Sequence, residues 1–149
     1  MTKKRDSQLR SRNSRYRALA EFRYHIREYL HFSDQAAKLA GLEPKQYQLL
    51  LAVSGLPDDV PPTVSVLAHQ LRTRHHSTVE LVNRAERNGL VKRSRSGNYV
   101  LVQLTKKGER TLERAVDRRL RELRNAGPIL VQALQQLIST DELPSRSRR

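Results

Sequence analysis

The amino-acid sequence predicts a mainly α-helical protein with one small β-hairpin, and three observations support this fold class. Apolar residues recur at steps of three and four over most of the chain, which is the spacing of amphipathic helices. Near residue 100 they recur instead at every second position, as in a strand. The 149 residues, 37% of them hydrophobic, are enough for one domain with a core and too few for two ordinary domains.

The first half of the chain predicts two helices followed by a loop. A long amphipathic helix is expected over about residues 15–40, where Gly41 stops it. The next helix begins near Pro44, because a proline in the first turn loses no helical hydrogen bond. Three prolines within residues 56–62 then exclude regular structure.

Two short helices joined by a tight turn follow this loop. Thr63 can cap the first, which ends near Leu71. The second spans about residues 75–88 and ends at a left-handed stop formed by Asn88 and Gly89. Such a pair is a helix-turn-helix unit, and its second helix fits the major groove of DNA.

The hairpin and the last helices complete the predicted fold. Strands are expected at Leu90–Arg93 and Tyr99–Leu104, with a turn at residues 96–98. Thr105 can cap a further long helix. Gly127-Pro128 is expected to break this helix, so that a separate final helix follows.

The net charge of +14 is concentrated in three segments. Residues 1–17 contain seven basic side chains and one acidic side chain. Residues 72–95 contain seven basic and two acidic side chains, and residues 144–149 contain three basic and no acidic side chains. We expect flexible basic tails at residues 1–14 and 144–149. The internal cluster lies in a patterned segment instead, and a positive field of this kind attracts nucleic-acid phosphates.

Several functional classes are disfavoured by what the sequence lacks. Without cysteine there is no disulfide, thiolate metal site or cysteine nucleophile. No apolar run approaches the roughly 20 residues of a membrane span, and the basic N-terminus lacks the apolar segment of a secretory signal. No nucleotide-binding loop or nucleophile elbow occurs. We therefore expect a soluble cytoplasmic protein that is not an enzyme, with no cofactor, no metal and no membrane partner.

The second short helix and the hairpin contain the candidate DNA contacts. The start of the helix presents short or planar hydrogen-bonding side chains, and free N–H groups there favour phosphate. A basic hairpin beside such a helix is a wing, which can enter the minor groove or contact the backbone. The candidates are Arg72, Arg74, His75, His76, Ser77, Thr78, Arg84, Arg93 and Arg95.

Three segments in order also point to a known family. They are TVSVLAHQL (63–71), HHSTVELVNRAERNGLV (75–91) and YVLVQLTKKGE (99–109). Over roughly residues 15–140, the chain resembles the MarR family of winged-helix transcriptional regulators. The resemblance implies one winged helix-turn-helix domain over residues 15–143. Its DNA-binding lobe would span about residues 44–104, and it would dimerise through N- and C-terminal helices at about 15–40 and 105–140.

The resemblance also implies a function. Family members are homodimers that bind pseudo-palindromic double-stranded DNA, and many release it when a small aromatic or phenolic anion binds. We therefore expect a transcriptional repressor controlled by such a ligand. Arginine and histidine beside tyrosine would suit an aromatic carboxylate, although packing is the alternative role for these residues. The pocket candidates are Tyr24, Arg27, His31 and Tyr47.

The chain departs from the family pattern at two places. Arg72 stands in the turn where the family usually has glycine, so either the turn differs or the arginine adds a phosphate contact. The wing is shorter, and Ser96-Gly97 replaces an Asp-Arg pair near its tip, which leaves Arg93 and Arg95 as the expected wing cations. The absence of cysteine excludes the branch of the family that senses thiol oxidation.

Two alternatives remain open at this point. A basic architectural or RNA-binding protein would explain the charge. Coating nucleic acid does not require a helix-turn-helix with a wing, however, and residues 72–95 lack aromatic side chains for base stacking. The pair His75-His76 resembles a metal site, but adjacent helical residues point about 100° apart and no third ligand stands nearby. A solvated polar face is the remaining alternative for this pair.

Overall fold

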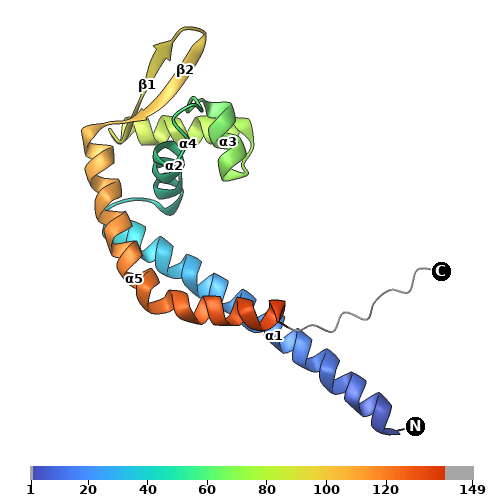
Figure 1. Cartoon of the computed structure of the whole chain (residues 1–149). Coiled ribbons are helices and arrows are strands. Elements are labelled where there is room, and N and C mark those ends of the chain that lie inside the picture. The colour runs from blue at the N-terminus through green and yellow to red at the C-terminus, as the bar shows by residue number, and fades with distance from the viewer. Residues whose placement is uncertain (1, 140–149) are drawn as a thin grey trace, which may run out of the picture. The chain divides into compact units, whose positions relative to one another are not determined.

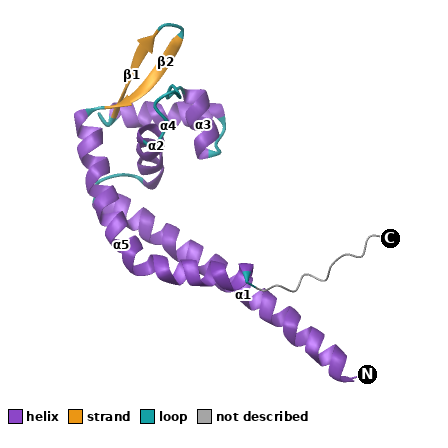
Figure 2. Ribbon diagram, in the orientation of Figure 1, coloured by secondary structure: helices purple, strands orange, loops and turns teal. Residues whose placement is uncertain are grey.

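The computed structural model describes residues 2–139, which form five helices and one antiparallel two-stranded sheet (Figures 1 and 2). This confirms the predicted fold class. Contacts divide the chain into two compact units. One is Ser33–Leu120, and the other joins the described residues up to Phe32 with those from Arg121 onward. The elements are α1 (Thr2–Leu39), α2 (Pro44–Ser54), α3 (Val64–Leu71), α4 (His75–Arg87), β1 (Val91–Ser96), β2 (Tyr99–Leu104) and α5 (Lys106–Ile138).

Two helix boundaries differ from the sequence-based expectation. Helix α1 begins at Thr2 rather than near residue 15, so the expected N-terminal tail is helical. Residues 2–14 contain no proline or glycine, and five of these thirteen residues are lysine or arginine, which favour helix. Helix α5 also continues through Pro128, because an internal proline removes one hydrogen bond without ending the helix when the flanking turns persist. The expected tail at 144–149 lies outside the described residues.

The core of the Ser33–Leu120 unit lies where α2, α3, α4 and the hairpin meet. Its fully buried side chains include Leu49 and Leu50 of α2, Leu67 of α3, Val82 of α4 and Val102 of β2. Helices α2, α3 and α4 therefore each contribute their apolar face to one cluster. The opposite faces of α3 and α4 remain in solvent, and the short helices are held in fixed positions by this packing.

Local capping signals set the helix starts as predicted. The Val66 amide donates to Thr63 Oγ1 at 3.3 Å at the start of α3. The Gly108 amide donates to Thr105 Oγ1 at 3.1 Å at the start of α5. Each bond satisfies one of the amides that a helix N-terminus leaves without an intrahelical partner.

Glycine at position 108 is required by a close approach. The first turn of α5 packs directly on the chain that leaves α4, and the Thr105 amide donates to the Leu90 carbonyl at 3.0 Å. A Cβ at Gly108 would overlap that same carbonyl oxygen and press on Leu50. The glycine therefore lets α5 begin against the base of the hairpin.

Candidate DNA-binding surface

The turn between α3 and α4 keeps a glycine-like backbone although its residue is arginine. Arg72 has φ 51° and ψ 44°, in the left-handed region, and its amide closes the C-terminus of α3. It is the one non-glycine residue with positive φ among residues 2–139. The departure noted in the sequence therefore leaves the turn unchanged, and places an exposed guanidinium beside the start of α4.

A pair of threonine hydroxyls closes this turn. Thr78 is fully buried, and its Oγ1 donates to the Arg74 carbonyl at 3.1 Å. Because its single hydroxyl hydrogen is used there, the Thr73 hydroxyl donates to Thr78 Oγ1, at 2.8 Å. The expectation that Thr78 contacts DNA does not fit this burial, because its side chain is not accessible to a partner.

Helix α4 presents one face to the core and the other to solvent. Leu81, Val82 and Ala85 are buried, and Val79 is half-buried. The predicted base- and phosphate-contacting residues of this element are exposed on the outside, apart from Thr78. They are Arg74, His75, His76, Ser77 and Arg84.

A groove of about 530 Å³ runs along the exposed side of α4. Ser77 and Arg84 line it together with Arg87, which follows them along the same face. Lys45, from the start of α2, lines it from outside the helix-turn-helix. Sequence reasoning missed Lys45 because only the tertiary fold brings α2 beside α4. Arg87 was visible in the basic cluster and could have been found from its helical spacing to Arg84.

The hairpin is a wing whose two strands are joined by a two-residue turn. Ser96 pairs with Tyr99, so Gly97 and Asn98 form the turn, and Gly97 has φ +59°. Arg93 and Arg95 lie on the same face of β1, since side chains alternate along a strand. Arg95 lies near the tip and is exposed.

The two wing arginines differ in their contacts. The Arg93 guanidinium forms an ion pair with the Glu86 carboxylate of α4, and its Nη2 donates to Asn83 Oδ1 at 2.6 Å. The side chain of Arg95 forms no hydrogen bond or ion pair with the residues that the structure describes. Of the two cations predicted for the wing, Arg93 is thus held against α4, whereas Arg95 is available to a partner.

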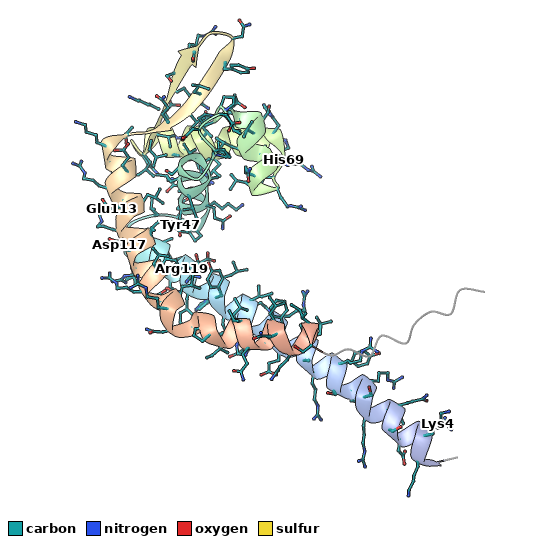
Figure 3. The ribbon with its side chains drawn as sticks, viewed as in Figure 1. Lys4, Tyr47, His69, Glu113, Asp117 and Arg119 are labelled. Carbon is teal, nitrogen blue, oxygen red and sulfur yellow. The ribbon has the colours of Figure 1, made fainter. Side chains whose placement is uncertain are left out.

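The pocket candidates are divided between the two units. Tyr24, Arg27 and His31 are exposed on α1. Tyr47 of α2, which Figure 3 labels, is buried in the core of the other unit. The Tyr24 ring meets His25 edge-on, with centroids 5.4 Å apart, and His31 meets Phe32 in the same way at 6.1 Å. The ligand pocket stays a prediction.

Within residues 2–139, no three His, Asp or Glu side chains gather closely enough to hold a metal ion. No helix of the same range combines the length and apolar character of a membrane span.

The arrangement of α3, α4 and the hairpin, with long helices on either side, defines a winged-helix DNA-binding protein. Residues 40–98 match the model of the MarR family. The fold is similar to that of a MarR family protein from Bacillus stearothermophilus, with 25% identity and a TM-score of 0.64 over 93% of this chain and 96% of that one. The match over residues 40–98 and this fold together support a winged-helix DNA-binding regulator that is similar to the MarR family.

Two further solved structures resemble the chain. The M. tuberculosis transcriptional regulator MosR in complex with DNA is 25% identical, with a TM-score of 0.55 over 77% of this chain and 89% of that one. CouR from Rhodococcus jostii, bound to p-coumaroyl-CoA, is 19% identical, with a TM-score of 0.60 over 81% of this chain and 88% of that one. Among curated proteins, none matches the sequence.

Proposed function

We propose that the chain is a homodimeric repressor that binds a pseudo-palindromic operator and releases it when a small aromatic or phenolic anion binds. The observation that supports this most is the exposed start of α4, held by a buried face and flanked by free arginines. The DNA complex of MosR supports the same use of the fold. The remaining steps assign roles to individual residues.

Base recognition is assigned to the first turn of α4. His75, His76 and Ser77 are exposed there. Their short or planar hydrogen-bonding side chains can contact base edges once the helix enters the major groove. Arg72 and Arg74 precede them and suit the flanking phosphates, which position the protein without selecting sequence. Arg84 and Lys45 would continue this phosphate contact along the groove.

The wing is assigned two roles. Arg95 near its tip contacts the minor groove or the adjacent phosphates, since it is exposed and basic. Arg93 positions the wing by its contacts with Glu86 and Asn83. The angle between wing and α4 then decides whether both elements can follow one duplex.

Dimerisation is supported by apolar side chains left in solvent on the N- and C-terminal helices. Exposed large apolar side chains that gather into a patch mark protein interfaces. A two-fold dimer would place the two α4 helices about one turn of DNA, roughly 34 Å, apart. The exposed large apolar residues of this unit are Leu9, Tyr16, Leu19, Tyr24, Leu30, Phe32, Ile129, Val131, Leu134 and Ile138.

Two measurements test this function together. A duplex selected from genomic fragments and a scrambled duplex of equal length are compared at moderate salt, and we expect a preference of roughly three orders of magnitude or more for the selected one. Sedimentation of the free protein should give a dimer. Equal binding of both duplexes would favour the architectural alternative and contradict the regulator.

The ligand is tested on the same complex. The p-coumaroyl-CoA bound to CouR supports a phenolic compound as the class of ligand that releases the protein from DNA. Titrating hydroxybenzoates and hydroxycinnamates should therefore weaken operator binding for at least one compound, and Arg27→Ala should remove that response without changing DNA affinity. If no compound shifts the Kd for DNA, the ligand-controlled part of this function is wrong.

A further inference from the structure

The start of α1 is strongly basic, and its charged side chains are not used by the proposed function. Residues 3–17 contain Lys3, Lys4, Arg5, Arg10, Arg12, Arg15 and Arg17 against the single acid Asp6. All the side chains of this segment are exposed, as Figure 3 illustrates for Lys4. None of its cations forms an ion pair with another described residue.

The helix arranges these cations in rows. Lys3, Arg10 and Arg17 follow one another at intervals of seven residues, which is nearly two turns and about 10 Å along the axis. Arg5 and Arg12 form a second row at the same interval. Like charges held in rows repel one another, so the segment gains most from a partner that supplies negative charge at regular intervals.

We propose that residues 3–17 form an additional DNA-contacting arm that binds phosphates and adds affinity without adding sequence preference. This inference rests on the proposed function, because that function makes duplex DNA the partner of the chain. Five of the seven cations are arginines, whose guanidinium fork matches phosphate oxygens. Leu9 and Tyr16 are the only large apolar residues in the segment, too few for the apolar face of a membrane-surface helix.

The test variant neutralises one row in the full-length protein. Lys3→Gln, Arg10→Gln and Arg17→Gln are combined, and glutamine preserves helix propensity at these exposed sites. A charge-conserving variant exchanges Lys3→Arg, Arg10→Lys and Arg17→Lys. A matched control combines Arg110→Gln, Arg114→Gln and Arg118→Gln, which removes the same charge from an exposed row of α5 that alternates with carboxylates.

The readout is the slope of log affinity against log salt on the selected duplex. Because each phosphate contact contributes about 0.9 to this slope, the neutralised row should lower it by nearly three units per chain. The charge-conserving and control variants should keep the slope of the original protein. The proposed DNA-contacting arm is contradicted if the slope of the neutralised variant is unchanged, or if the control variant loses as much slope.

The preference for the selected over the scrambled duplex separates this inference from the proposed function. Phosphate contacts carry no base information, so that ratio should be the same in all these variants. A ratio near one in the original protein contradicts the regulator itself, whatever the slopes are. If the neutralised row instead reduces binding to single-stranded RNA or to phosphatidylserine vesicles and leaves the duplex slope unchanged, the DNA arm is wrong.

Discussion

The guanidinium of Arg93, on the first strand of the wing, is paired with the carboxylate of Glu86, on helix α4. The chain turns back at Gly89 between them, with φ +70°, so that β1 starts beside the end of α4. Asn83, one turn earlier on α4, accepts a second hydrogen bond from the same guanidinium. Wing and helix are thereby connected by side chains as well as by the core.

This pair predicts a measurable coupling between the two elements. In a double-mutant cycle of Arg93→Ala and Glu86→Ala, we expect an interaction of about 0.5–1 kcal/mol in the free energy of unfolding, as for other partly exposed ion pairs. Chemical denaturation of the four proteins measures it. Strictly additive effects would mean that the pair does not form in solution.

Arg95 should behave differently because it is available to DNA. Arg95→Ala is expected to lower the salt slope by about one unit and to weaken binding to all sequences alike. Stability should change little, since the side chain is exposed. A loss confined to one operator sequence would show that Arg95 reads a base step instead of the backbone.

Arg72 gives opposite predictions for stability and for binding. Its left-handed backbone is strained for any residue with a Cβ, so Arg72→Gly should raise the free energy of unfolding by up to about 1 kcal/mol. The same substitution removes an exposed cation next to α4 and should weaken DNA binding. Thermal unfolding and DNA titration measure the two effects. A destabilised Arg72→Gly protein would contradict the glycine-like turn.

Gly108 and Gly127 form a matched pair within α5. Gly108→Ala is expected to destabilise the fold by about 3 kcal/mol or more, because the new Cβ meets the Leu90 backbone. At Gly127 the nearest atoms to such a Cβ belong to Leu123, at 3.8 Å. Gly127→Ala should therefore be neutral or stabilising, by up to about 1 kcal/mol. Equal losses at both sites would mean that α5 does not pack on Leu90 as described.

Features encoded within a few residues were predictable from the sequence. Thr63 and Thr105 cap their helices as expected, and the stops at Gly41 and Gly89 have positive φ. These features depend on neighbours at most four residues away. The order of such local signals is what indicated a winged helix before any tertiary contact was known.

Features decided by tertiary contacts could not be predicted. Thr78 appeared to belong to the exposed start of α4, yet its partner Thr73 and the core bury it. Lys45 reaches the groove of α4 from another helix. The ion pair of Arg93 was missed because nothing in a linear pattern shows that Glu86 would face it across the turn at Gly89, and the DNA contact expected of Arg93 stays a prediction.

The base preference of variants in the first turn of α4 tests the central claim most directly. His76→Ala and Ser77→Ala are each used to select duplexes from a random pool, and the selected sequences are compared with those chosen by the original protein. If this turn reads bases in the major groove, each substitution should relax or change the preferred base at one position of each half-site. Unchanged sequences from both variants would show that another part of the molecule recognises the operator.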